Sequence, residues 1–195
     1  MVRVLAVNNY PSIERFDRLR DSLASNGAEV TSADWRGANG STFNKFDGVV
    51  LSGSPDMLSE HNVRTKFAKE LEAISETKAP LLGICFGLQL IGCAFGSTVV
   101  KNGPMIREYV DTDVLRPDGL FEWLPPKIRV FESHEEAVSP LPSGFILLAR
   151  SKTSPIAAMR HSTRPIRGLQ FHPERNGAET PHGNTVVANF VKGLG

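Results

Sequence analysis

The stretch PLLGICFGLQLIG, residues 80–92, decides how this chain folds. PLLGI is a continuous apolar run, typical of a strand buried on both faces of a parallel sheet, and an apolar helical pattern follows it at once. Between the two, Cys85 is flanked by Gly83 and Gly87. A side chain at either glycine would collide with the neighbouring strand or the helix backbone. The stretch therefore predicts a strand, a sharp turn that holds Cys85 above the sheet edge, and a helix from Phe86.

Strands and helices alternate on the amino-terminal side of this stretch. Apolar runs predict strands at residues 2–8, 28–33 and 47–53. Apolar residues at helical spacing predict one helix after Pro11 and another over residues 63–76. This alternation is typical of an α/β protein whose helices cover a parallel sheet.

The pattern changes from about residue 97, where short extended segments are separated by Pro, Gly, Ser and Asp. We expect these segments to pair locally, some of them antiparallel, before a last helix over residues 185–194. The sequence thus predicts an α/β fold with an open, mostly parallel sheet flanked by helices and a small antiparallel edge portion. The length favours a single domain over residues 1–195.

Charge and composition narrow the functional classes. The chain has 22 Lys+Arg and 21 Asp+Glu, a formal net charge of +1, and carries no long run of like charges. We therefore expect neither nucleic acid nor a membrane surface as its main partner. We also expect a cytoplasmic chain, since neither a signal-peptide pattern nor a membrane-spanning run is evident. The two cysteines, Cys85 and Cys93, are too few for a disulfide framework and are expected to be reduced. No cofactor and no metal ligand cluster is predicted.

The turn at Cys85 favours a reactive thiolate. A helix that begins near Phe86 directs its free N–H groups and positive dipole end at the sulfur. The Phe86 N–H is then one donor to a developing oxyanion, and the turn at Gly53 supplies a second. The competing interpretation is that Cys85 is a small core residue and the glycines only allow close packing.

A nucleophilic cysteine needs a base, and the sequence contains five histidines: His61, His134, His161, His172 and His182. His172 differs from the others because it closes an apolar strand in GLQFHPE, residues 168–174, and open α/β sheets gather their sites at the carboxyl ends of strands. Glu174 follows two residues later and can accept a hydrogen bond from the imidazole. The competing interpretation of His-Pro-Glu is an ordinary exposed turn.

Together, GICFGLQ, LSGSP and GLQFHPE resemble the motifs of the class I glutamine amidotransferase family, the triad glutaminases. The resemblance covers nearly the whole chain and implies a flavodoxin-like fold. It implies that Cys85 attacks the side-chain amide of L-glutamine and forms a γ-glutamyl thioester. His172 is then the residue that protonates ammonia and activates water, and Glu174 orients it. The N–H groups at Gly53 and Phe86 are implied as the oxyanion hole.

The same resemblance suggests substrate-binding residues. Gln89, one helical turn beyond the nucleophile, is similar to the family residue that holds the α-amino and α-carboxylate end of glutamine. Ser54 follows the oxyanion turn, and Ser133 and His134 in FESHEEAV resemble a segment that lines the same pocket. Ser133 and His134 are alternatively a solvated turn.

The branch of the family stays open. Residues 155–174 resemble the glutaminase part of GMP synthetases, whereas residues 7–19 resemble the opening of anthranilate synthase glutaminase chains. The sequence departs from the family pattern at Leu88, at LSGSP and in the loop at residues 175–177. With no synthetase segment in the sequence, the resemblance implies that a separate synthase subunit, such as GMP synthetase, receives the ammonia. The alternatives are a stand-alone γ-glutamyl hydrolase or amidase and a catalytically idle regulatory subunit.

Overall fold

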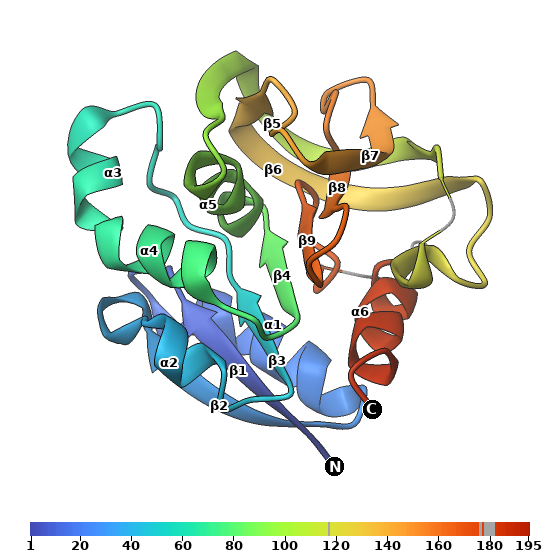
Figure 1. Ribbon diagram of the computed structural model, residues 1–195. Coiled ribbons are helices and arrows are strands. Elements are labelled where there is room, and N and C mark those ends of the chain that lie inside the picture. The colour runs from blue at the N-terminus through green and yellow to red at the C-terminus, as the bar shows by residue number, and fades with distance from the viewer. Residues whose placement is uncertain (117, 176, 178–181) are drawn as a thin grey trace.

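A computed structural model of the chain describes residues 1–116, 118–175, 177 and 182–195. Over these residues the strands form one nine-stranded sheet in the order β2-β1-β3-β4-β9-β8-β7-β5-β6 (Figure 1). The strands are β1 (Val2–Asn8), β2 (Ala28–Asp34), β3 (Gly48–Leu51), β4 (Leu81–Ile84), β5 (Thr98–Val114), β6 (Lys127–Ser139), β7 (Phe145–Ser151), β8 (Ala158–His161) and β9 (Ile166–Leu169). The helices are α1 (Ile13–Ser25), α2 (Gly40–Phe43), α3 (His61–Lys66), α4 (Ala68–Glu76), α5 (Phe86–Ala94) and α6 (His182–Lys192), with short 3-10 turns η1 (Trp35–Gly37) and η2 (Gly119–Phe121).

The sheet has a parallel half and an antiparallel half that meet at β9. Strands β2, β1, β3, β4 and β9 pair in parallel, and β9, β8, β7, β5 and β6 pair antiparallel. The predicted α/β fold is confirmed, and the antiparallel portion is larger than expected. Two segments that the sequence presents as separate strands are joined in β5, which has 17 residues and pairs with β6 across a register shift between Lys101 and Ile106.

Two hydrophobic clusters fill the space between the sheet and its helices. In β1, Val4 and Ala6 face the cluster under α1 and α6, whereas Leu5 and Val7 face the cluster under α2, α3, α4 and α5. This alternation follows from the period of two along a strand, and it explains why the four buried residues of β1, residues 4–7, are all apolar. Helices therefore cover both faces of the parallel half (Figure 1).

The helix predicted over residues 63–76 is two helices that meet at Phe67. The Phe67 side chain is fully buried, and its ring centroid lies 4.5 Å from that of Trp35 and 4.8 Å from that of Phe86. Packing against α5 therefore overrides the continuous helical periodicity of the sequence. Among the described residues, no helix is long and apolar enough to cross a membrane.

Candidate active site

Cys85 occupies the sharp turn between β4 and α5. Its backbone has φ of 52° and ψ of −101°, in a region that residues other than glycine rarely adopt. A Cβ atom placed on Gly83 would lie 2.4 Å from the carbonyl carbon and oxygen of Gly87, and one placed on Gly87 would lie 2.7 Å from the Leu51 oxygen. The predicted reason for the two glycines is therefore confirmed: helix backbone and neighbouring strand approach too closely for any side chain.

His172 and Glu174 follow β9, the strand beside β4 in the sheet. The His172 Nδ1 and the Glu174 Oε1 lie 2.7 Å apart, and both side chains are buried. The His172 backbone N–H donates to the Phe131 carbonyl at 2.8 Å, which ties this turn to β6. Burial alone would lower the pKa of His172, but the negative charges of Glu174 and Cys85 and its hydrogen bonds to both side chains raise that pKa to about 10. The imidazole is therefore a cation at neutral pH when the sulfur is a thiolate.

The sulfur of Cys85 contacts two further groups. In its thiol form it donates to the Ser133 carbonyl at 3.6 Å, and it accepts from the Gln170 side-chain N–H at 3.6 Å. Gln170 is fully buried and lies in the GLQFHPE motif, two residues before the base. The sequence prediction gave it no role, although its place two residues before His172 on an apolar strand was a usable signal.

Gly53 follows β3 and lies between two side chains of the site. A Cβ atom there would lie 2.4 Å from the Tyr10 hydroxyl and 2.9 Å from His172 Cε1. The sequence prediction also omits Tyr10. Tyr10 follows β1, and only the parallel pairing of β1 with β3 brings it beside Gly53. Burial, followed by the charges of Glu174 and Cys85, raises the pKa of Tyr10, so that its hydroxyl stays protonated.

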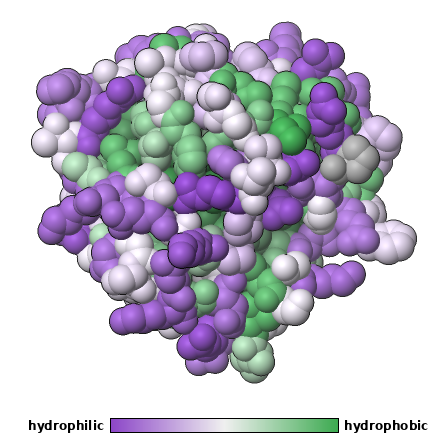
Figure 2. All heavy atoms as spheres, in the orientation of Figure 1, coloured by the Kyte–Doolittle hydropathy of each residue, from purple (hydrophilic) through white to green (hydrophobic). Residues whose placement is uncertain are grey.

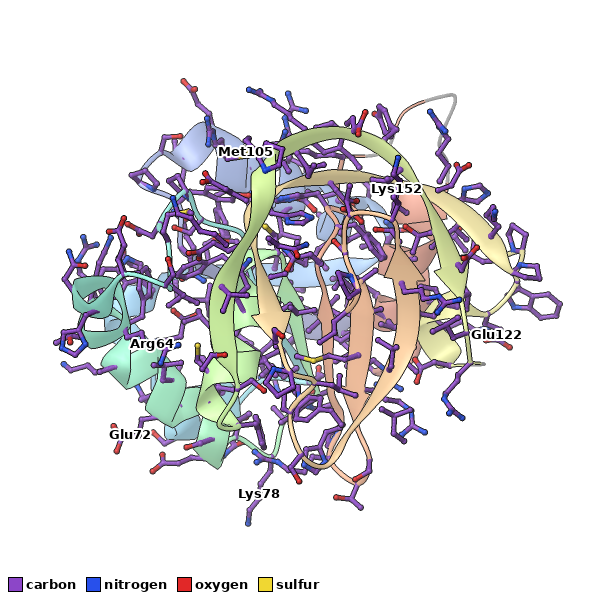
Figure 3. The ribbon with its side chains drawn as sticks, turned by 90° about the horizontal axis from the view of Figure 1, so that it is seen from above. Arg64, Glu72, Lys78, Met105, Glu122 and Lys152 are labelled. Atoms are coloured by element: carbon purple, nitrogen blue, oxygen red, sulfur yellow. The ribbon has the colours of Figure 1, made fainter. Side chains whose placement is uncertain are left out.

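The groups around Cys85 line a pocket of about 220 Å³. Three guanidinium side chains, those of Arg15, Arg107 and Arg175, lie around it, and Met105 joins them from β5. Figure 3 shows Met105 on the curved part of the β5 ribbon, at the edge of the antiparallel half. The pocket thus takes residues from both halves of the sheet, and its wall carries three carboxylates, those of Asp56, Glu135 and Glu136, beside the three guanidinium groups.

Ser54, Gln89, Ser133 and His134, predicted to bind substrate, all line this pocket. Most of their polar groups already have partners in the protein. The Ser54 hydroxyl donates to Asp56 at 3.2 Å, and the Gln89 side-chain N–H donates to the Glu136 carbonyl at 3.0 Å.

The His134 ring is buried and has partners at both nitrogens. Its Nδ1 lies 3.1 Å from the Glu136 carbonyl oxygen, and its Nε2 lies 2.9 Å from a Glu132 carboxylate oxygen. A role of the ring as a direct ligand of glutamine therefore gains no support, and the alternative of a solvated turn does not fit the burial either.

Leu88 is fully buried and lies against Gly168, where a Cβ atom would lie 3.0 Å from the Leu88 Cγ. Its departure from the family pattern is thus a matter of packing beside the site. In the loop at residues 175–177, Asn176 lies outside the described residues, whereas the Arg175 guanidinium stacks over the Phe131 ring at 5.1 Å. Within the described ranges, no group of three or more His, Cys, Asp or Glu side chains could hold a metal ion.

Comparison with known proteins shows which family the chain belongs to. Residues 5–194 match the family model of glutamine amidotransferase class-I. The chain belongs to the class-I glutamine amidotransferase family, and the resemblance inferred from its motifs is confirmed at that level.

Individual relatives are similar over most of the chain. The chain is 43% identical over 145 residues to the A subunit of the glutamine-hydrolyzing GMP synthase of Pyrococcus abyssi, which covers 74% of each protein. It is 36% identical over 152 residues to the corresponding subunit of Methanocaldococcus jannaschii, covering 76% of this chain and 74% of that protein. Among solved structures, a putative A subunit of the GMP synthase from Thermoplasma acidophilum superposes with a TM-score of 0.87 at 30% identity, covering 100% of this chain and 94% of the other.

Proposed function

We propose that this chain hydrolyses L-glutamine to glutamate and ammonia with Cys85 as nucleophile, His172 as acid and base, and Glu174 as the residue that orients His172. One observation carries the proposal: Cys85 and His172 line the same pocket, and the Nδ1 of the His172 imidazole lies 2.7 Å from a Glu174 carboxylate oxygen. This order of nucleophile, imidazole and carboxylate is the arrangement that acyl transfer requires.

The steps follow from the positions of these groups. The Cys85 sulfur forms a bond to the side-chain amide carbon of glutamine, and the amide oxygen takes the negative charge. The backbone N–H of Phe86, at the open first turn of α5, and that of Gly53 supply the hydrogen bonds for this oxyanion. His172 gives its proton to the amide nitrogen, and ammonia leaves as the C–N bond breaks. Water deprotonated by His172 then cleaves the γ-glutamyl thioester, which releases glutamate and restores the thiol.

The pocket supports glutamine as the substrate. It is small, at about 220 Å³, and its guanidinium side chains suit the negative charge of an α-carboxylate. Ser54, Gln89 and the backbone of Ser133 stand at its wall and are the proposed substrate contacts.

We further propose that the ammonia serves a separate synthase subunit of the GMP synthetase type. The relatives in Pyrococcus abyssi and Methanocaldococcus jannaschii are both named as the A subunit of a GMP synthase, which supports this assignment over that of an anthranilate synthase component. We place the chain in the cytoplasm as one catalytic domain, where a free thiol such as Cys85 stays reduced.

The test is covalent labelling with a glutamine-like diazo-ketone, read by peptide mass analysis. We expect one adduct on Cys85, and we expect glutamine to protect against it. Cys93→Ala, the matched control, removes the other thiol, whose pKa is raised by burial, and should label like the parent chain. Cys85→Ala should neither label nor release ammonia from glutamine. Equal labelling of both cysteines, or none, contradicts the proposal and favours an idle subunit.

A further inference from the structure

Glu132 on β6 is a carboxylate in the protein interior that the proposed chemistry leaves without a role. Its side chain has no exposed surface. The Ser151 hydroxyl donates to its Oε1 at 2.7 Å, and the Thr153 and Ser154 hydroxyls donate to its Oε2 at 2.6 and 3.0 Å. All three donors come from the end of β7 and the turn after it, which Lys152 marks in Figure 3.

His134 completes this cluster from two residues along the same strand. Burial alone would raise the pKa of Glu132, but hydrogen bonds from His134 and from the surrounding hydroxyls lower it, so that the carboxyl is ionised. A carboxylate and a carbonyl can only accept hydrogen bonds. The His134 ring faces one of each, the Glu132 Oε2 at 2.9 Å from Nε2 and the Glu136 carbonyl at 3.1 Å from Nδ1. The Ser154 hydroxyl lies 2.9 Å from the same Nε2, so that His134, Glu132 and Ser154 form one closed hydrogen-bonded cluster.

The strand segment held by this pair is also the wall of the pocket. The Ser133 carbonyl accepts from the Cys85 thiol, and the Glu136 carbonyl accepts from Gln89 at 3.0 Å. The Glu136 carboxylate accepts the backbone N–H groups of Leu58, at 2.7 Å, and of Ser59, at 3.1 Å. Residues 132–136 therefore join α5, the loop after β3 and the turn after β7 into one framework.

A buried carboxylate such as that of Glu132 is a poor way to gain stability, because the cost of its desolvation offsets the attraction of its partners. A fully bonded polar cluster does, however, specify one arrangement of the backbone. We propose that Glu132 and His134 are positioning residues, a buried and hydrogen-bonded carboxylate–imidazole pair that fixes residues 133–136 as the wall against which the α-carbon end of glutamine binds. This inference rests on the proposed glutaminase function.

Steady-state kinetics of the Glu132→Gln variant test the inference. The amide keeps the size of the side chain but turns an N–H₂ group toward donors, so that the segment loses its fixed position. We expect KM for glutamine to rise by about tenfold or more, kcat to stay within about threefold, and the rate of Cys85 alkylation by iodoacetamide to stay within about twofold. A mere loss of stability lowers the active fraction, and hence kcat, without this rise in KM. The matched control is Glu29→Gln, an exposed carboxylate on β2 at the other edge of the sheet.

Two further measurements keep the inference testable on its own. Thr153→Val removes one donor and keeps the shape, and it should raise KM by about threefold even if Glu132→Gln does not fold. Proton NMR of the parent chain should show a His134 ring N–H that is protected from exchange with solvent, as a buried and hydrogen-bonded imidazole requires, whether or not glutamine is hydrolysed. Unchanged KM in both variants of an active enzyme, or a rapidly exchanging His134 ring N–H, overturns the positioning role. Loss of glutamine hydrolysis in the parent chain instead overturns only the proposed function.

Discussion

At the scale of single residues, the site depends on one strained conformation. Cys85 has a positive φ, and such conformations cost about 1 to 3 kcal/mol. The cost is offset locally, because the Cys85 N–H donates to the Leu169 carbonyl at 2.7 Å and its carbonyl accepts from the Gln89 N–H at 3.1 Å. The Cys85 backbone is thus held from both sides, by β9 and by α5.

A second buried carboxyl, Glu70 on α4, lies behind the oxyanion turn. The Asn9 side chain donates to Glu70 at 3.2 Å, and the Asn9 backbone N–H donates to the Ser52 hydroxyl at 2.9 Å. Burial raises the pKa of Glu70 to about 8. The Glu70 Oε2 and the Asn9 Oδ1 have no partner within the described part of the chain. A carboxyl with a pKa of about 8 is mostly protonated at pH 7, so Glu70 is neutral there.

This assignment predicts how stability varies with pH. Since the pKa of Glu70 rises from 4.5 to about 8 on folding, the folded state binds more protons than the unfolded state in that window. The Glu70 contribution is complete below pH 4.5 and is lost as the pH rises through about 8. We compare the unfolding free energy of Glu70→Gln with that of the parent, measured by urea unfolding. Between pH 5 and pH 9 we expect this difference to shift by about 1 to 3 kcal/mol in favour of the variant. Glu72→Gln, an exposed carboxyl on the same helix, is the control. Parallel pH profiles for parent and Glu70→Gln contradict the assignment.

The sequence predicts those site residues whose local pattern carries their chemistry. Cys85 was identifiable from its glycines, and His172 and Glu174 from their place at a strand end. Tyr10 was not, because nothing near it in the sequence indicates that it reaches the site. Its place there arises from the pairing of β1 with β3 across the sheet, which a single sequence does not encode locally. Gln170 could have been chosen from its place two residues before His172.

At the scale of elements, the close contact between β4 and α5 is the tightest feature of the site. Gly83 faces the backbone of Gly87 with no room for a methyl group. We expect Gly83→Ala to lower the free energy of unfolding by about 2 to 3 kcal/mol, because the helix must move away from the strand. The control is Gly37→Ala, since a Cβ atom there meets nothing within 4 Å. Denaturant unfolding measures both, and equal stability of the two variants contradicts the packing argument.

Element prediction succeeded where burial and periodicity agree. The strand expected at residues 2–8 is β1 with the same bounds, because its pattern is apolar and ends in polar residues. The helix over residues 63–76 was predicted as continuous and breaks at Phe67 because α5 and η1 bury that ring. The length of β5 escaped prediction because Gly103 and Pro104 indicate a break between two strands, whereas β5 runs through them where its register with β6 shifts.

At the scale of the whole molecule, the pocket opens beside the antiparallel half. Figure 2 shows hydrophilic residues spread over one face of the molecule with hydrophobic ones between them. The residues at the pocket wall include three arginines and the exposed Met105. Charged and apolar groups of this kind suit a surface that another protein covers in part.

This arrangement predicts that binding of a synthase partner changes glutamine hydrolysis. We expect the ATP-pyrophosphatase subunit of a GMP synthetase from the same cell to bind the chain and to raise its kcat/KM for glutamine about tenfold. Glutamate release measured with and without that subunit, and binding measured by sedimentation, test this. Cys85→Ala should bind equally well and release nothing. Full activity of the isolated chain, indifferent to the added subunit, favours a stand-alone hydrolase, and turnover of γ-glutamyl amines then becomes the next measurement.

The place of β9 in the sheet sets the order in which the enzyme matures. β9 follows all the other strands in the chain, yet it lies between β4 and β8 and alone bridges the two halves. During synthesis the other strands of both halves leave the ribosome before β9 does, so we expect the pairings that unite the two halves to form last. His172 follows β9 directly, so the proposed base reaches Cys85 only once the sheet is complete. Maturation of the fold and the proposed activation of Cys85 are then one event.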